Sequence, residues 1–244
     1  MTHVTDWLQA TGTDVLLLQE LKATEFPTEA FRELGYESVA VCQKSYNGVA
    51  ILSKVPIETV SLALPGGNED THARYLESII DAPFGRVRVV CIYLPNGNPV
   101  GTDKFLYKLQ WMDRLIQQMM QWKSDPIPTV IGGDFNVIPE DIDCDKPANW
   151  VRDALFQPEP RDRYRAMQSM GWTDAFRKLH PEVKDVFTYW DYFRQAFERN
   201  RGIRIDHFLL SPELTPRLQA CVVDKGPRGQ EKPSDHTPVV LTLG

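Results

Sequence analysis

Short apolar runs alternate with segments of helical periodicity along the whole chain, and this alternation constrains the fold more than any other feature. Six runs are nearly continuous in Val, Ile and Leu and are bounded by Gly, Pro, Asp or Asn, which is typical of strands covered on both faces. They lie at residues 14–20, 48–54, 87–95, 129–136, 203–211 and 237–244. The pattern predicts an α/β fold.

Helices are expected between these strands. The periodicity predicts them at residues 4–10, 28–34, 102–123 and 169–179. The segment 138–164 is acidic, rich in Pro and weakly periodic, so we expect a long loop with short helical turns, a kind of segment that is often functional. No break in composition marks a linker, and we therefore expect a single domain over residues 1–244.

The composition suits a chain with a sizeable core. Of the 244 residues, 42% are hydrophobic and 25% are charged. No apolar run approaches the roughly 20 residues needed to span a bilayer, and the first residues do not resemble a secretion signal, so we expect no membrane partner and a cytoplasmic location. The four cysteines lie far apart and form no CxxC, which disfavours a zinc site or disulfide framework; Cys42 and Cys91 are expected to be buried thiols.

The net charge is −6 and the isoelectric point about 5.4. Averaged over the chain, this charge argues against a nucleic-acid partner, whose phosphates attract basic proteins. An enzyme can, however, gather carboxylates around a divalent cation and keep a basic face elsewhere. Net charge therefore does not exclude a nucleic-acid substrate.

Polar side chains stand at the ends of four predicted strands, which is where open α/β sheets bind ligands. They are Glu20, Asp134 with Asn136, Asp206 with His207, and Asp235 with His236. Each has a structural alternative. Glu20 could be a solvated strand end, the pair at 134 and 136 an Asx-turn, and the pair at 235 and 236 a surface turn. Asp206 could form a structural salt bridge with Arg201 or Arg204. His207 points to the opposite face of its strand, so we expect it to be structural.

Taken together, these side chains suggest chemistry at a phosphate. Several carboxylates and an amide form the oxygen-rich ligand set that Mg²⁺ prefers. An Asp beside a His holds the imidazole in one tautomer and stabilises its charged form. Such a set suits hydrolysis of a phosphate ester, in which the metal neutralises the phosphate and a carboxylate positions or deprotonates water.

The same residues occur in motifs that resemble the endonuclease/exonuclease/phosphatase superfamily, and within it the exonuclease III type of apurinic/apyrimidinic (AP) endonuclease. The motifs, in chain order, are LLLQELK, IYLPNG, GGDFN, NRGIRIDHFLLSP and PSDHTPV. The resemblance covers essentially the whole chain. It implies a four-layered αββα sandwich of two packed mixed β-sheets flanked by helices.

The resemblance also implies roles for individual residues. The catalytic residues would be Tyr93, Asp134, Asn136, Asp206 and His236. The metal ligands, for Mg²⁺ with Mn²⁺ as the alternative, would be Glu20, Asp134, Asn136 and Asp235. Because these groups would titrate as a coupled set, the division between proton transfer and metal binding stays open.

Substrate contacts are expected from Asn96 and Arg74, and from the aromatic and basic segment 188–202. Within that segment the predicted contacts are Tyr189, Trp190, Arg194 and Arg201. Aromatic and basic side chains of this kind can enter the minor groove and hold phosphates. For Tyr189 and Trp190, packing in the core is the alternative.

The resemblance therefore implies a monomeric Mg²⁺-dependent DNA repair nuclease. It would act on double-stranded DNA, cutting 5′ to abasic sites and degrading duplexes from their 3′ ends. One alternative is a phosphodiesterase or phosphatase for a small molecule or lipid head group on the same scaffold. Another is a truncated form that binds DNA but has weak activity.

One departure from the family pattern concerns the first strand. Family members begin with a strand that carries an Asn-x-Asn motif, whereas this chain begins at MTHVTDWLQA, which aligns with the helix after that strand. We therefore expect the strand and its Asn to be lacking. Losing an interior strand exposes unpaired backbone on its neighbours. We expect this form to be less stable and weakly active.

Overall fold

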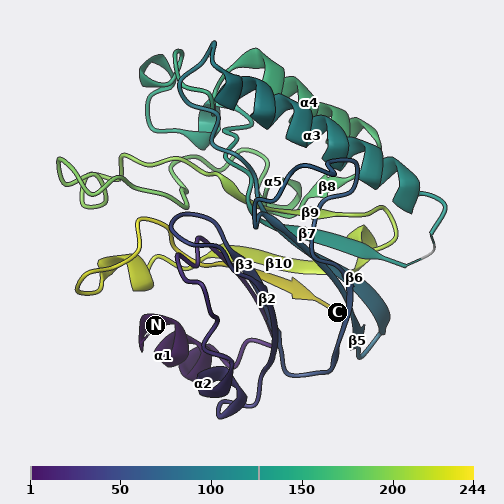
Figure 1. The fold of residues 1–244 in the computed structure, drawn as a ribbon. Coiled ribbons are helices and arrows are strands. Elements are labelled where there is room, and N and C mark those ends of the chain that lie inside the picture. Colours follow the sequence, from purple (N-terminus) through teal and green to yellow (C-terminus); the bar gives the residue numbers. More distant parts are fainter. Residues whose placement is uncertain (1, 126) are drawn as a thin grey trace.

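The computed structural model describes residues 2–125 and 127–244. It consists of two layers of β-strands packed face to face, with helices on both outer sides (Figure 1). The larger sheet has six strands in the order β4-β5-β6-β7-β9-β8. Their bounds are Ile57–Ser61 (β4), Tyr75–Ala82 (β5), Gly85–Tyr93 (β6), Thr129–Asp134 (β7), Thr173–Asp174 (β8) and Asp206–Leu210 (β9). β6 and β7 are parallel and the other neighbours are antiparallel, so the sheet is mixed.

The second layer consists of two separate groups of strands. One has the order β1-β3-β2, with bounds Val15–Gln19 (β1), Glu37–Val41 (β2) and Val49–Ser53 (β3). The other is the antiparallel pair of β10 (Leu218–Val223) and β11 (Val239–Leu243). The two layers and the flanking helices confirm the predicted αββα class.

Two helices cover the outer face of each layer (Figure 1). On the side of β1-β3-β2 they are α1 (Thr2–Thr11) and α2 (Thr28–Arg32), and on the side of the larger sheet they are α3 (Asp103–Trp122) and α4 (Pro158–Ser169). The short helix α5 (Ala175–Leu179) follows β8, and single 3₁₀ turns lie at 141–143, 147–149, 215–217 and 227–229. In the part of the chain that the structure describes, no helix combines the length and the apolar character that a membrane crossing requires.

The central strands are apolar on both faces because both faces are covered. In β6, Val90 and Ile92 pack with Met112 of α3, while Val89 and Cys91 pack into the core between the two sheets. The alternation follows from the two-residue period of a strand. All four cysteines are free; Cys91 is buried as predicted, whereas Cys42 is only half-buried.

A cavity of about 940 Å³ separates the two groups of strands in the second layer. Val15 and Leu17 of β1 line one side of it, and Val239 and Leu241 of β11 line the other. Within the described residues β1 pairs with β3 alone and β11 with β10 alone, so both strands present an unpaired edge to the cavity. Both edges carry unpaired backbone groups to which one more strand could pair.

The cavity between the unpaired edges of β1 and β11 leads to a prediction about stability. A version of the chain extended upstream by an apolar extended segment is expected to melt at least about 5 °C higher, since pairing both edges and burying the cavity wall would add on the order of 2 kcal/mol. Thermal unfolding followed by circular dichroism measures this. A Gly/Ser-rich extension of equal length is the matched control. Equal melting temperatures and equal activities for all three versions would contradict the prediction.

Two predictions about helices are wrong. The helix expected at 169–179 is interrupted, because α4 ends at Ser169 and Gly171 adopts a φ of +100° that begins a turn into β8. Only the last part of that segment is helical, as α5. The segment 138–164 holds two 3₁₀ turns as expected, but its end from Pro158 belongs to α4 rather than to a loop.

Candidate active site

Side chains from three strand ends meet at one end of the sandwich. Glu20 follows β1, Asp134 ends β7, and His236 lies three residues before β11. One potential metal-binding atom from each of these residues lies within 4.8 Å of those of the other two. The strand ends predicted to converge therefore do so, although they come from both layers of the sandwich.

Asp206 and His236 form a hydrogen-bonded pair beside this group. The Nδ1 atom of His236 lies 2.9 Å from Oδ2 of Asp206, and Asp206 stands opposite Asp134 in the β7–β9 ladder. Although burial opposes it, the Asp206 carboxylate raises the pKa of His236 well above its usual value. The alternative salt bridge from Asp206 to Arg201 or Arg204 is absent from the described residues.

A tight turn after β7 fixes the two asparagines of the site. The backbone N–H of Asn136 donates to Oδ1 of Asp134 at 2.8 Å, so the expected Asx-turn is present. The Asn136 amide also donates to Oδ2 of Asp134 at 3.0 Å and to the Leu94 carbonyl at 2.8 Å. Asn96 donates to Oδ1 of Asn136 at 3.1 Å. The turn therefore fits both the structural and the functional interpretation, because it ends a strand and also orients the amide groups of the site.

Glycine is required next to Asp134. Gly133 has a φ of +137°, and a Cβ atom there would lie 2.1 Å from the Ile92 carbonyl oxygen. No side chain fits at that distance. Gly133 of GGDFN thus allows β7 to approach β6 closely where the site begins.

Tyr93 and Lys22 hold the carboxylate of Glu20. The Tyr93 hydroxyl donates to Oε1 at 2.6 Å, and Nζ of Lys22 lies 3.1 Å from Oε2. Burial raises the pKa of Tyr93, so its hydroxyl stays protonated and remains a donor. Arg74 lies 4.7 Å from the centre of the Tyr93 ring and donates to the Tyr93 carbonyl at 3.1 Å. Tyr93 and Arg74 therefore both stand at the site.

The donor set fits a hard divalent cation. Burial raises the pKa of Asp134, and the nearby carboxylates of Asp206 and Glu20 add to the effect. Oxygen ligands with excess negative charge are what Mg²⁺ binds. Glu20 and Asp134 offer them directly. Asp235 lines the same cavity but is not among the three groups that lie within 4.8 Å of one another, so its role as a ligand stays a prediction.

The segment 188–202 packs beside the pair of Asp206 and His236. The ring of Tyr189 lies 5.0 Å from that of His236, edge on. Arg194 and Arg201 are exposed, as a contact with DNA requires. Trp190 has no exposed surface and packs against Phe197, so a direct contact of Trp190 with substrate is wrong for this structure.

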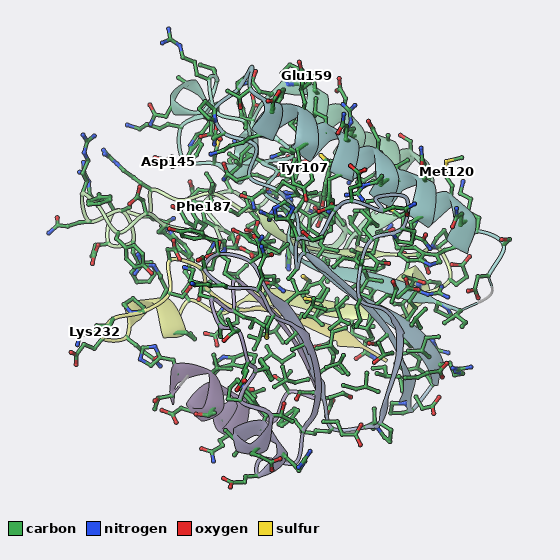
Figure 2. All side chains as sticks on the ribbon, in the orientation of Figure 1. Tyr107, Met120, Asp145, Glu159, Phe187 and Lys232 are labelled. Carbon is green, nitrogen blue, oxygen red and sulfur yellow. The ribbon has the colours of Figure 1, made fainter. Side chains whose placement is uncertain are left out.

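The exposed aromatic residues of that segment are different ones. Tyr192 and Phe193 are 58% and 76% exposed, and the sequence analysis did not single them out. The guanidinium of Arg228 lies 5.3 Å from the Tyr192 ring and donates to the Trp190 carbonyl at 3.1 Å, which supports the segment from beneath. The loops that carry Phe187, Asp145 and Lys232 lie at this same end of the molecule (Figure 2).

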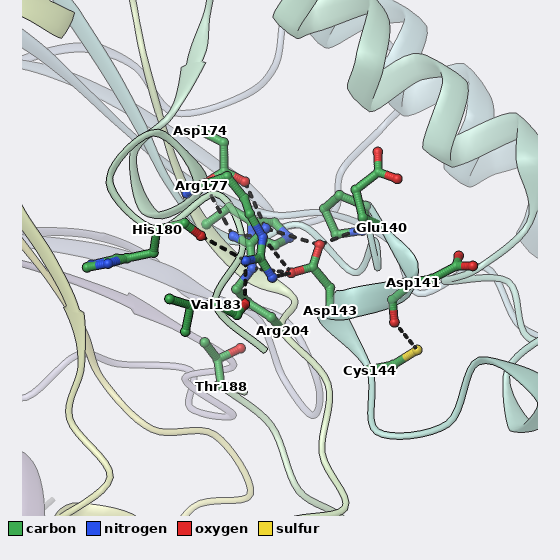
Figure 3. Close-up of polar contacts among 12 residues, drawn as sticks. Glu140, Asp141, Asp143, Cys144, Asp174, Arg177, His180, Val183, Thr188 and Arg204 are labelled. Atoms are coloured by element: carbon green, nitrogen blue, oxygen red, sulfur yellow. Dashed lines mark hydrogen bonds and ion pairs between the residues drawn. The ribbon is translucent and has the colours of Figure 1, made fainter. Parts of the chain in front are cut away.

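Asp143, Asp174, Arg177 and Arg204 form a buried ionic network (Figure 3). Arg204 is 1% exposed; its Nε lies 2.7 Å from Asp143 and its Nη2 lies 2.9 Å from Asp174. Arg177 adds a second cation to Asp143. His207 contacts Arg204 at 2.8 Å and the Val137 carbonyl at 3.0 Å, and burial with the Arg204 charge lowers its pKa to about 4. The prediction that His207 is structural agrees with these contacts.

The network makes a prediction about acid stability. Against the effect of burial, Arg204 lowers the pKa of Asp143 and lowers that of Asp174 to about 2. Since the unfolded value is about 3.9, this stability is present above about pH 4 and is lost as the pH falls toward 2. Urea unfolding between pH 5 and 2 should show the loss, and an unchanged free energy of unfolding over that window would contradict it.

Thr188 is a residue at the site that the sequence analysis missed. Its Oγ1 accepts the backbone N–H groups of Ile205 and Asp206, each at 3.1 Å, and its carbonyl accepts the N–H of Thr237 at 2.9 Å. The side chain is fully buried. Thr188 therefore braces the backbone on both sides of the pair formed by Asp206 and His236. No sequence signal marks it, because these contacts join distant segments.

Two substitutions of Thr188 distinguish the contribution of its hydroxyl group from that of its size and shape. Thr188→Val should lower kcat about 10-fold, since a residue that orients a catalytic group typically contributes 10- to 100-fold. Thr188→Ser keeps the acceptor oxygen and should retain near-normal kcat. Steady-state kinetics well below the melting temperature of both variants measures this. Equal kcat values for the two variants would rule out the bracing role.

Comparisons with known proteins agree with this geometry. The model of the Endonuclease/Exonuclease/phosphatase family matches residues 1–236. Exodeoxyribonuclease III of Haemophilus influenzae is 34% identical over 235 residues, which are 93% of this chain and 88% of the relative. DNA repair nuclease APEX1 of Danio rerio is 31% identical over 98% of this chain and 76% of its own length.

Solved structures are also similar over nearly the whole chain. An AP endonuclease from Archaeoglobus fulgidus superposes with a TM-score of 0.92 and 34% identity, covering 98% of this chain and 92% of the other. The 3′ phosphatase NExo from Neisseria, bound to a product DNA hairpin, superposes with a TM-score of 0.94 and 34% identity, covering 100% and 93%.

Proposed function

Because the chain belongs to the endonuclease/exonuclease/phosphatase family, we propose that it is a metal-dependent DNA repair nuclease with exodeoxyribonuclease III and AP endonuclease activity. It hydrolyses phosphodiester bonds. The observation that carries the proposal is the convergence of Glu20, Asp134 and His236, with Asp206 bonded to the imidazole. Mg²⁺ is the proposed cation, with Mn²⁺ as a substitute.

Glu20 and Asp134 would hold the cation, with Asp235 as a further proposed ligand. Asn136 is not proposed as a ligand, because Asn96 takes one lone pair of its Oδ1 and the other is assigned to the attacking water. When bound, the cation neutralises the charge of the phosphate and polarises its oxygens. The Tyr93 hydroxyl donates to Oε1 of Glu20. Oε2 of Glu20, beside Lys22, is therefore the oxygen left to face the site. This arrangement orients the carboxylate before substrate arrives.

Asp134 is the proposed acceptor of the proton from the attacking water. Its carboxylate is held by the backbone N–H and the amide of Asn136 and lies in the group formed with Glu20 and His236, where an attacking water would reach it. Both amide N–H groups of Asn136 are already bonded, so its Oδ1 is the atom left to accept a hydrogen bond from that water. Asn96 donates to the same oxygen and fixes its direction.

His236 is the proposed donor to the phosphate. Its Nδ1 is bonded to Asp206, so Nε2 remains free to donate to a phosphate oxygen. A protonated imidazole in a buried site stabilises negative charge as it develops in the transition state. Asp206 keeps the imidazole protonated and correctly turned.

Double-stranded DNA is the proposed substrate, cut 5′ to abasic sites and degraded from its 3′ ends. The exposed Tyr192, Phe193, Arg194 and Arg201 beside the site support it, because aromatic and basic side chains serve base stacking and phosphate contacts. Arg74 and Tyr189 would contact the nucleotide at the scissile phosphate. We further propose that the chain acts as a single-domain monomer in the cytoplasm.

A phosphodiesterase for a small molecule or lipid head group would use the same catalytic residues. The aromatic and basic segment 188–202 disfavours that alternative, since a small substrate does not need it. Competition separates the two: duplex DNA should inhibit hydrolysis of a generic phosphodiester at low concentration and in a salt-dependent way. Hydrolysis that is insensitive to duplex DNA would favour the small-substrate enzyme. Salt-dependent DNA binding without turnover would favour the weakly active binding form.

The position of the cut tests the finer proposal. A duplex labelled at one 5′ end and carrying one abasic analogue should yield a single product that ends immediately 5′ to the lesion. An undamaged duplex should yield a ladder shortened from its 3′ end. A cut elsewhere, or random nicking of both duplexes, would contradict the proposed specificity.

A further inference from the structure

Lys108 is a buried lysine in the middle of α3, and burial lowers the pKa of its amine to about 7. Its side chain has no exposed surface, whereas its helical neighbours Trp111, Met112 and Leu115 form part of the apolar core. No carboxylate in the described part of the chain lies within salt-bridge distance of it. Burying an ammonium group without a carboxylate costs several kcal/mol unless other groups bind it. Its contacts therefore call for an explanation beyond packing.

Two backbone carbonyl groups bind the ammonium of Lys108. Nζ donates to the Asn96 carbonyl at 3.0 Å and to the Asn136 carbonyl at 2.5 Å. These two residues lie 40 positions apart and on different loops, one after β6 and one after β7. They are also the two asparagines whose side chains bond each other at the site. Lys108 thus links the two loops through their backbone carbonyl groups, while the side-chain amides of Asn96 and Asn136 link them directly.

The backbone of both loops depends on this arrangement. Asn136 has a φ of +46°, a left-handed conformation that costs energy for a residue other than Gly and persists only where its surroundings hold it. Gly97 has a φ of +87°, and a Cβ atom there would lie 2.6 Å from Cδ of Lys108. The loop that carries Asn96 therefore closes directly onto the lysine stem.

We propose that Lys108 is a positioning residue for the hydrolytic reaction, which holds the Asn96 and Asn136 loops so that Oδ1 of Asn136 faces the attacking water. The inference rests on the proposed function for the reaction itself, but the alignment of the two loops is independent of it. Lys108 is buried beneath the site and does not touch substrate. Its loss should therefore lower kcat and leave KM unchanged.

The kinetic test compares four variants on the duplex with an abasic analogue. Lys108→Met keeps the length of the side chain without donors, and kcat should fall about 10- to 100-fold, the range for residues that orient catalytic groups. Lys108→Arg keeps donors and charge and should recover most of kcat. Lys108→Gln keeps donors without charge, and it decides the outcome if Lys108→Met does not fold. Met119→Ala, on the same helix, should lower the melting temperature and leave kcat unchanged.

A second readout does not depend on activity. The side-chain amide NMR signals of Asn96 and Asn136 should shift and exchange faster with solvent in Lys108→Met, but not in Met119→Ala. If the wild-type chain proved inactive, these signals would still test the positioning, so the two proposals can fail separately. Unchanged asparagine signals, or wild-type kcat in a folded Lys108→Met variant, would overturn the inference. A rise in KM with unchanged kcat would overturn it as well.

Discussion

Replacing Asp206 by Asn is expected to lower kcat about 10³-fold, within the range that proton-transfer and charge-stabilising groups contribute. The substitution keeps the shape of the side chain and one acceptor oxygen for Nδ1 of His236. It removes the negative charge that holds His236 in its protonated form. Without that charge the pKa of His236 should fall toward its usual value, so that less of the imidazole would be protonated to stabilise the phosphate in the transition state.

Single-turnover cleavage of the duplex with an abasic analogue measures this effect apart from product release. Asp185→Asn is the matched control, since Asp185 is exposed and its φ of +60° suits Asn equally well. It should retain the wild-type rate. The rates should be compared well below the melting temperatures of the wild-type chain and of Asp206→Asn, so that only folded protein is assayed. A rate within a few-fold of wild type would remove Asp206 and His236 from the chemistry.

Arg204→Met is expected to destabilise the fold by about 3–5 kcal/mol, the typical loss when one partner of a buried ion pair is removed. Asp143 and Asp174 would remain buried without their shared cation, although Arg177 would still contact Asp143. Both carboxylates are essentially unexposed, so water cannot take the place of the arginine. The melting temperature should fall by roughly 10 °C for a chain of this size.

Urea unfolding followed by fluorescence gives the free energy directly. Arg32→Met is the control, because Arg32 is 66% exposed and pairs with Glu29 at the surface, where such a pair contributes less than about 1 kcal/mol. A loss for Arg204→Met no larger than that for Arg32→Met would show that the network does not stabilise the fold. A normal kcat at low temperature is expected, since no member of the network reaches the substrate.

Much of the sheet architecture could be predicted because strands covered on both faces have a continuous apolar pattern. β5 escaped detection although it lies in the middle of a sheet. Glu77 interrupts its apolar pattern, and Glu77 is buried only because Arg88 and Tyr75, on β6 and on β5 itself, bind its carboxylate. Such compensation between strands cannot be read from one segment. α4 was missed for a related reason, since only Pro160, Tyr164 and Met167 of its residues are buried.

The candidate site was predictable where residues stand at strand ends, because the topology brings those ends together. Trp190 was misjudged, since an aromatic side chain in a loop gives no sign of which way it faces. Thr188 and Lys108 were not singled out because they act through backbone groups of distant segments. The sequence does offer one signal for Lys108, which is its place among apolar residues at helical spacing. Phe105, three residues before it, and Met112, four residues after it, are both buried.

The most direct test of the central claim is incision of an end-labelled duplex with one abasic analogue, in Mg²⁺ and in EDTA. The account predicts a Mg²⁺-dependent cut immediately 5′ to the lesion, abolished by EDTA and reduced about 10³-fold in Asp206→Asn. A cut that persists in EDTA would contradict metal-dependent hydrolysis at this site. If neither this chain nor a version extended upstream cut the duplex, the DNA repair function would be wrong.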